Sequence, residues 1–160
     1  MSVLEYLEEA EEKNMTKVKH VMTTNVVTVR KDTPISQATE LLMSNDITGM
    51  PVVEEDMTLV GVISEKDVLN LFYSSGQTTN RTVSDFMTTP AVHFEQDDDI
   101  QDVCACLMEN NFRRVPVTSN GKVVGIVSRR DILDYMSHSD SDRTAQKDLS
   151  ELANTRFIGQ

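Results

Sequence analysis

The sequence contains no tryptophan, two cysteines, four prolines and six glycines, and aromatic residues make up 5% of its 160 residues. So little glycine and proline excludes a collagen-like chain, and apolar residues spread through most of the length exclude a wholly disordered one. No apolar run approaches the ~20 residues that a membrane-spanning helix requires. The N-terminal residues MSVLEYLEEAEEK are acidic, whereas a secretory signal begins with basic residues and continues with apolar ones. We therefore expect a cytoplasmic protein with no membrane association.

Positive charge is also scarce, with 15 Lys and Arg against 26 Asp and Glu, and the formal net charge is −11. A balance this acidic makes nucleic acid or an anionic lipid surface an unlikely partner, although a local basic patch can still hold an anionic ligand. The chain length suits one domain or two small units that share a core.

The dominant feature of the sequence is an internal repeat. Residues 18–53 align with residues 83–118 at an offset of 65, as in Met22 and Met87 or Asn45 and Asn110. After a single-residue deletion, residues 59–69 align with residues 123–133 at an offset of 64. Several matching blocks in the same order predict two homologous units of about 50 residues each.

Each unit has the same predicted order of elements, β-α-β-β-α. Short stretches rich in β-branched residues predict first strands at Val26–Val29 and Ala91–Phe94. Helices follow, the first entered through Pro34 and the second through an Asp98–Gln101 capping box, and they end near Asn45 and Asn110. Two strands then form a hairpin in each unit, and a short helix closes it over residues 65–72 or 129–136.

Segments outside the repeat complete the predicted organisation. Residues 1–16 predict an acidic helix with a narrow apolar stripe of Val3, Leu4 and Leu7. The first unit spans residues 17–72, a polar linker spans 73–82, the second unit spans 83–136, and a polar tail spans 137–160. The tail is either mobile or docked through its sparse apolar residues, and both alternatives stay open.

The motif richest in chemistry is S-x-x-D, which occurs directly after a strand in each unit, as Ser64 to Asp67 and as Ser128 to Asp131. One interpretation is a helix cap, in which the serine oxygen accepts a backbone N–H and the aspartate complements the helix dipole. The other is a ligand site, because a helix N-terminus suits phosphate and a carboxylate one turn later can accept two ribose hydroxyls. Its occurrence in both units favours the second interpretation.

The sequence at this point resembles tandem cystathionine-β-synthase (CBS) domains, the adenosine-sensing pair called a Bateman module. The resemblance covers about residues 17–136 and rests on MTTNVVTV and MTTPAVHF, the strand starts MPVV and VPV, and the endings GVISEKD and GIVSRRD. It implies an α+β fold in which two β-α-β-β-α units pack with pseudo-twofold symmetry around two clefts. It also implies a regulatory protein that binds AMP, ADP, ATP or S-adenosylmethionine, forms a homodimer and signals to a regulated partner that remains unknown. We expect neither an enzyme nor a bound cofactor, and the alternative is a ligand-independent interaction scaffold.

The resemblance assigns site residues position by position. Asp67 and Asp131 hold ribose hydroxyls, and Ser64 and Ser128 lie near phosphate. The remaining positions border the base or line the same clefts, namely Val27, Thr28, Val92, His93, Met50 and Val115. We expect no metal site, because the histidines are scattered and the acidic run at residues 95–99 suits the first turn of a helix.

The two predicted clefts differ in charge. Between residues 113 and 130 the second unit carries five cations and no acid, including Arg113, Arg114, Arg129 and Arg130. The aligned stretch of the first unit has Lys66 against four carboxylates. Because arginine binds phosphate in a fork, we expect the cleft containing Asp131 to bind a nucleotide more tightly and to favour ATP or ADP over AMP. The alternative is that these arginines only solvate the surface.

Overall fold

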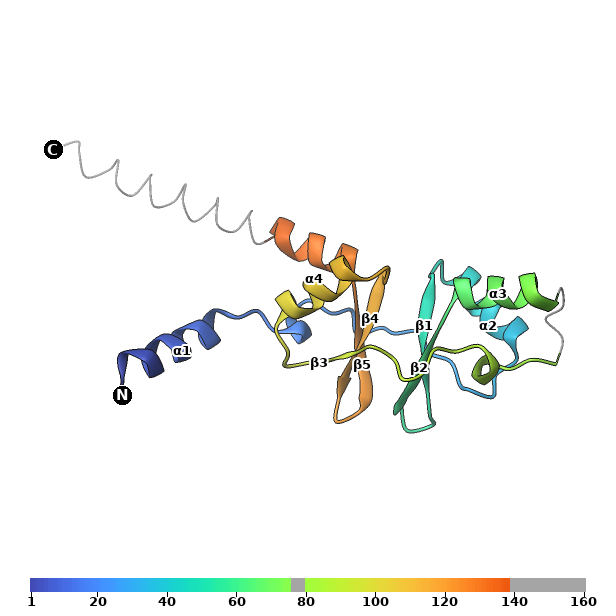
Figure 1. Cartoon of the computed structure of the whole chain (residues 1–160), viewed down its shortest axis with the longest axis horizontal. Helices are drawn as coiled ribbons and strands as arrows, with labels where there is room; N and C mark the ends of the chain where they lie inside the picture. Colours follow the sequence, from blue (N-terminus) through green and yellow to red (C-terminus); the bar gives the residue numbers. More distant parts are fainter. Residues whose placement is uncertain (76–79, 139–160) are drawn as a thin grey trace.

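The computed structural model describes residues 1–75 and 80–138, and it confirms an α+β protein built from two repeated units (Figure 1). The first unit comprises α2 (Ile35–Ser44), β1 (Gly49–Val53), β2 (Leu59–Ser64) and α3 (Glu65–Ser75). The second comprises β3 (Phe94–Glu95), α4 (Ile100–Glu109), β4 (Arg114–Ser119), β5 (Lys122–Ser128) and a helix over residues 129–138. In each unit the two longer strands pair antiparallel as a hairpin, as predicted.

The predicted first strands are much shorter than expected. Val26–Val29 contributes only an isolated parallel bridge between Val29 and Val52, and Ala91–Phe94 contributes one end of the two-residue β3. Val29 donates to the carbonyl of Pro51 (3.1 Å) and accepts from Val53 N (2.8 Å). The next bond of a parallel ladder requires an N–H from Pro51, and proline has none. The proline at the third position of β1 and of β4, Pro51 or Pro116, therefore ends the parallel pairing.

Helix boundaries follow the predictions with two corrections, the first being that Pro34, expected at the first helical position, is the N-cap of α2. Asn45 and Asn110 are the C-caps of α2 and α4, and each side-chain amide donates to the carbonyl four residues earlier, at 2.8 and 2.9 Å. The N-cap of α4 is Asp99, which accepts from Gln101 N at 3.0 Å. The predicted Asp98 cap is wrong by one residue, because the Asp98 carboxylate instead accepts from Glu95 N at 2.8 Å.

The first residues of the predicted linker and of the predicted tail are helical. Residues 73–75 continue α3 and residues 137–138 continue the closing helix, while 76–79 and 139–160 lie outside the described residues. α1 (Val3–Asn14) is the predicted N-terminal helix and projects away from the two units (Figure 1). Its Val3, Leu4 and Leu7 side chains are 76%, 72% and 51% exposed. In the part of the chain that is described, none of the helices combines the length and the apolarity needed to cross a bilayer.

The two units exchange their first residues. The short helix η1 (Val18–His20) begins the first repeat, yet Val18 is fully buried in the core of the second unit. The short helix η2 (Val83–Asp85) begins the second repeat, and Val83 is fully buried in the core of the first. The reciprocal backbone bonds are Val18 N to Asp98 O and Val83 N to Thr33 O, both 2.9 Å. Each unit therefore needs the other to complete its core.

The exchanged segments also cross the hairpins on the side where the units meet. Thr88 pairs with Val62 of β2, and Thr23 pairs with Ile126 of β5, each through two backbone hydrogen bonds of 2.9–3.0 Å. A glycine precedes the paired residue in each hairpin, Gly61 in β2 and Gly125 in β5. The missing side chain lets the crossing backbone approach closely.

We expect Gly61→Ala to lower the free energy of unfolding by about 1–3 kcal/mol, because overpacking at a tight contact forces the backbone apart. A Cβ atom at Gly61 would lie 2.7 Å from the carbonyl oxygen of Thr88, which belongs to the backbone. Urea unfolding measures the loss. The matched control is Gly125→Ala, where the nearest atoms belong to the flexible Met22 side chain, so the loss there is smaller. Equal losses for the two variants would contradict this account.

Candidate functional site

Both S-x-x-D motifs form the same helix cap. Asp67 Oδ2 accepts from Ser64 N (2.8 Å) and Ser64 Oγ (2.9 Å), and Asp67 N donates to Ser64 Oγ (3.3 Å). In the second unit Asp131 Oδ2 accepts from Ser128 N (2.8 Å) and Ser128 Oγ (2.9 Å), and Asp131 N donates to Ser128 Oγ (3.1 Å). The capping interpretation of the motif is therefore present in both units, and it holds each carboxylate rigidly at the start of a helix.

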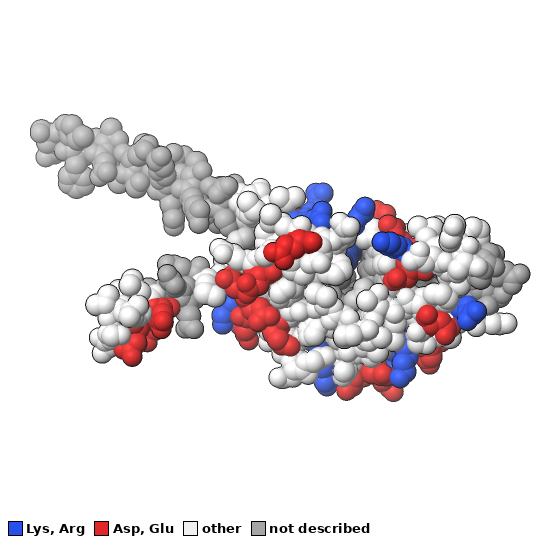
Figure 2. All heavy atoms as spheres, in the orientation of Figure 1, with Lys and Arg blue, Asp and Glu red and all other residues white. Residues whose placement is uncertain are grey.

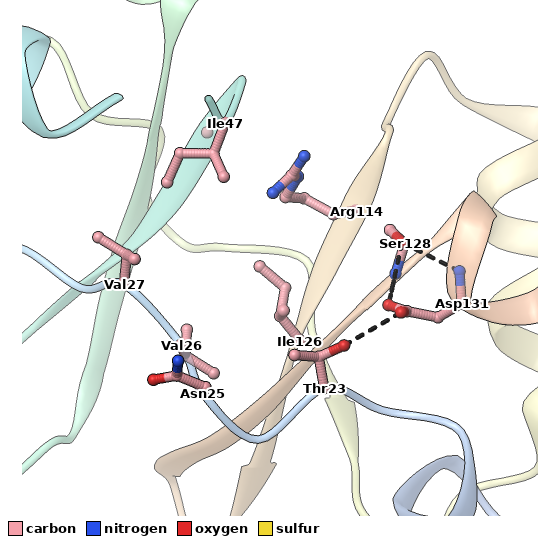
Figure 3. A pocket seen from close by; sticks show the side chains of 10 residues that line it. Thr23, Asn25, Val26, Val27, Ile47, Arg114, Ile126, Ser128 and Asp131 are labelled. Carbon is pink, nitrogen blue, oxygen red and sulfur yellow. Dashed lines mark hydrogen bonds between the residues drawn. The ribbon is translucent and has the colours of Figure 1, made fainter. Parts of the chain in front are cut away.

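Asp131 also forms a hydrogen bond with a residue of the other repeat. Thr23 Oγ1 donates to Asp131 Oδ1 at 3.0 Å, across 108 residues of sequence (Figure 3). An ionised carboxylate offers about four acceptor positions. The serine and threonine contacts occupy three of them at Asp131, which leaves one acceptor position beside the Thr23 oxygen, and both residues line the space between the units. Two neighbouring acceptors of this kind suit a pair of vicinal hydroxyls.

A cavity of about 190 Å³ opens beside this pair, where the two units meet (Figure 3). Its apolar wall is formed by Val26, Val27, Ile47 and Ile126. Its polar lining is formed by Thr23, Asn25, Ser128, Asp131 and Arg114, and Gly49 also lines it. An apolar slot with hydroxyl acceptors at one end and a cation nearby has the chemistry needed to hold a planar base attached to a sugar and an anionic group.

Arg114 is the cation of this cavity. Its side chain extends from β4 toward Ile47 on the opposite unit (Figure 3). The Nε atom is buried and has no hydrogen-bond partner in the described structure. Buried donors on charged groups nearly always have a partner, because leaving one unpaired is costly. The Nε atom of Arg114 therefore lacks a hydrogen-bond acceptor, and an anionic group of a ligand would supply one.

Several of the predicted site residues lie elsewhere. Met50 and Val115 are each 1% exposed and belong to the two cores, and it is the preceding residues, Gly49 and Arg114, that line the cavity. Strand alternation explains this shift by one position, because successive side chains point to opposite faces. The remaining predicted residues do not line the cavity, namely Asp67, Ser64, Thr28, Val92, His93, Arg113, Arg129 and Arg130.

Arg129 has a structural contact instead. Its Nη2 donates to the carbonyls of Leu107 (3.0 Å) and Asn110 (3.4 Å), at the C-terminal end of α4. A cation at that end complements the helix dipole and satisfies carbonyls that lack helical partners. Arg129 does not line this cavity, so its predicted contact with a ligand phosphate stays a prediction.

Thr23, Asn25 and Ile47 line the cavity although the sequence analysis did not single them out. Thr23 and Asn25 lie in the stretch MTTNVVTV, which contributed to the family resemblance, but only Val27 and Thr28 of that stretch were assigned to the site. The stretch therefore pointed to this part of the lining, through Val27, without singling out Thr23 or Asn25.

The acidic run at residues 95–99 has protein partners. Asp97 lies 2.9 Å from Lys19 Nζ and 3.6 Å from Lys17 Nζ, and the hydrogen bond from Lys19 lowers the pKa of Asp97 below its ordinary value. Glu95 accepts from Thr118 Oγ1 at 2.8 Å. Within the described residues no group of His, Cys, Asp and Glu side chains is placed to hold a metal ion. The run thus attaches the exchanged N-terminal segment to the second unit.

Comparison with known proteins agrees with this architecture. A family model described as the CBS domain matches residues 18–74 and 83–138. CBSX1, a chloroplastic CBS domain-containing protein of Arabidopsis thaliana, is 32% identical over 133 residues, which cover 66% of this chain and 56% of that protein. The chain spans 50%, 56% and 58% of the first three curated relatives that it matches, so it corresponds to about half of their length.

Solved structures of CBS pairs superpose over most of the chain. CBSX2 of Arabidopsis thaliana in complex with AMP is 31% identical and superposes with a TM-score of 0.71, over 78% of this chain and 98% of that one. The CBS domain pair of protein MJ0100, in complex with 5′-methylthioadenosine and S-adenosyl-L-methionine, is 25% identical with a TM-score of 0.68, over 78% and 98%. In these relatives the same pair of units occurs with adenosyl ligands.

Proposed function

The chain belongs to the CBS-domain family, and on this premise we propose that it is a regulatory CBS pair that binds an adenosine-containing ligand between its units and passes the occupancy on to a partner protein. The observation that carries the proposal is the cavity beside Asp131, where an apolar slot, two hydroxyl acceptors and an unpaired arginine donor converge. The candidate ligands are AMP, ADP, ATP and S-adenosylmethionine. The proposed activity is binding, with no reaction on the ligand.

The lining suggests how such a ligand is held. The base lies against Val27, Ile47 and Ile126, because apolar walls exclude water from a planar ring. The ribose hydroxyls donate to Asp131 and Thr23, and the anionic group accepts from Arg114. Asn25 adds an amide that can bond to either the base or the sugar.

We expect at least one of AMP, ADP, ATP and S-adenosylmethionine to raise Tm by several degrees. A ligand present at one hundred times its Kd adds about 2.7 kcal/mol to the stability of the bound state. For a chain of this size that free energy corresponds to a rise of several degrees. A thermal-shift panel with the four compounds measures it, with inorganic phosphate as the control. Unchanged Tm with all four would favour the alternative function, a ligand-independent scaffold.

One residue offers a route from the cavity to the protein surface. Ile47 lines the nucleotide cavity and also a second, larger depression on the outer face of the first unit, between α2 and α3. A ligand that pushes on Ile47 changes the shape of that depression, because packed side chains transmit displacement rather than absorb it. We propose this contact as the means by which occupancy reaches a bound protein.

We also propose that the chain forms a homodimer through its outer helices. Apolar side chains are exposed at equivalent positions of both units, including Met43 (76%) with Met108 (81%) and Leu69 (64%) with Leu133 (63%). Exposed apolar surface of this extent, repeated on both units, marks an interaction face. Light scattering is expected to give twice the 18.0 kDa mass of one chain.

A further inference from the structure

The N-terminal helix α1 exposes an apolar stripe to solvent. Val3, Leu4 and Leu7 share one side of the helix, because residues three and four apart are neighbours on its surface. More than half of each of these side chains is exposed. Figure 2 shows acidic side chains along another side of α1, at the left of the molecule. An amphipathic helix of this kind buries its apolar side against another element, so the stripe is a docking surface.

The sequence caps this helix but does not make it long. Ser2 N donates to the Glu5 carboxylate (2.7 Å) and Glu5 N donates to Ser2 Oγ (3.2 Å), which together form a capping box. With 12 residues, α1 has a length at which an isolated helix is only marginally stable in water. Contact along the stripe supplies the stabilisation that so short a helix lacks.

The C-terminal end of α1 is held beside the helix over residues 129–138. Thr16, two residues beyond the end of α1, shares a hydrogen bond with Tyr135 through their hydroxyl groups (2.9 Å), and its carbonyl accepts from Ile100 N (2.9 Å). Tyr135 lies close before His138, the last residue that the structure describes. The end of α1 and the start of residues 139–160 therefore lie at the same end of the molecule (Figure 1).

The tail, residues 139–160, lies outside the described residues, but its sequence has a matching apolar pattern. Its apolar residues recur at the spacing of one helix face, namely Ala145, Leu149, Leu152 and Ala153. At 1.5 Å per residue α1 is about 18 Å long, and a helical tail of this length extends about 33 Å. The tail is therefore long enough to reach the whole stripe. Because it leaves the point at which α1 arrives, the two segments run antiparallel when they lie side by side.

We propose that the tail is the occupant of the α1 stripe, so that the two ends of the chain form an antiparallel pair of helices. A segment tethered beside the stripe has a much higher effective concentration there than a separate molecule. A second copy of α1 is a poorer occupant, because Glu5, Glu8 and Glu9 of two such helices repel one another. The inference goes beyond the proposed function and uses no residue of the nucleotide cavity.

Cross-linking within one chain tests the contact. Leu4→Cys and Leu149→Cys are combined in a chain that also carries Cys104→Ala and Cys106→Ala, and a short bismaleimide is added. We expect a cross-linked product with the mass of a single chain. The matched control has Glu9→Cys in place of Leu4→Cys. Glu9 is exposed on the opposite side of α1, so we expect several-fold less product.

The cross-linking has outcomes that overturn the proposal. Equal yields from the Leu4 and Glu9 pairs show that the tail does not select the apolar side of α1. A product with the mass of two chains assigns the stripe to a second copy of the protein. Calorimetry with AMP reports separately on the nucleotide site, which can fail while the single-chain product still forms.

Hydrogen exchange gives a second measurement in the uncross-linked chain. Leu149→Asp with Leu152→Asp is expected to speed exchange of the α1 amides at least about tenfold, because an uncovered helix opens more often. The control, Ser150→Asp with Asn154→Asp, adds the same two charges away from the apolar positions of the tail and is expected to leave α1 exchange unchanged. Unchanged α1 exchange in the Leu149 and Leu152 variant overturns the proposal.

Discussion

Asp131→Ala is expected to abolish the tighter of the nucleotide-binding events, while Asp67→Ala leaves that event intact. Each hydrogen bond between a hydroxyl and a charged acceptor contributes about 1.5–3 kcal/mol, so the loss of the one ribose bond that Asp131 accepts lowers affinity about 10- to 150-fold. The structure places Asp131 and Thr23 at the cavity, and the alignment explains why the cleft beside Asp67 is expected to be weaker. The repeat position of Arg114 is occupied in the first unit by Gly49, which has no side chain to offer.

The two aspartates form a matched pair. Both lose the same serine cap when replaced by alanine, so the change in helix stability is shared and the difference in binding reports the ligand site. Isothermal calorimetry with AMP, ADP and ATP measures both variants, and the comparison of the three ligands also tests the expected preference for ADP or ATP. If Asp67→Ala removed the tighter event and Asp131→Ala spared it, the assignment of the clefts would be reversed.

Arg114→Gln is expected to weaken AMP binding about 10- to 100-fold and to leave adenosine binding unchanged. The Arg114 side chain lines the cavity, and its buried Nε has no partner within the described residues, so a phosphate gains charge-assisted hydrogen bonds there. One such bond is worth about 1.5–3 kcal/mol when it is shielded from water. Adenosine lacks the phosphate, so it forms no bond with Arg114 that the substitution could remove.

Calorimetry measures the Kd of AMP and the Kd of adenosine for the wild-type chain and for Arg114→Gln. The change in the ratio of these two Kd values tests whether Arg114 binds the phosphate. Arg30→Gln removes one positive charge from an exposed position outside the cavity, and it controls for the change in net charge. Equal weakening of AMP and adenosine would mean that Arg114 shapes the cavity instead of binding the phosphate. Unchanged AMP affinity would place the phosphate elsewhere.

The sequence alone determined the features that depend on neighbouring residues and on the repeat. The offset of 65 and then 64 predicted two units, the apolar spacing predicted their helices, and the hairpins formed where the polar turns predicted them. The asparagines at the helix ends and the serine-aspartate caps also formed, because such bonds span only three or four residues. A hydrogen bond between residues three or four apart does not depend on the path of the rest of the chain.

The tertiary structure alone decided which distant residues meet. Val18 and Val83 lie in each other's units, and Thr23 reaches Asp131 across 108 residues, because the chain crosses between the units at the start of each repeat. That crossing selects Arg114 from a group of four arginines as the cation of the cavity and leaves Arg129 to cap α4. Local pattern fixes the faces of a helix or strand, but only the packing of the two units fixes which faces enclose a site.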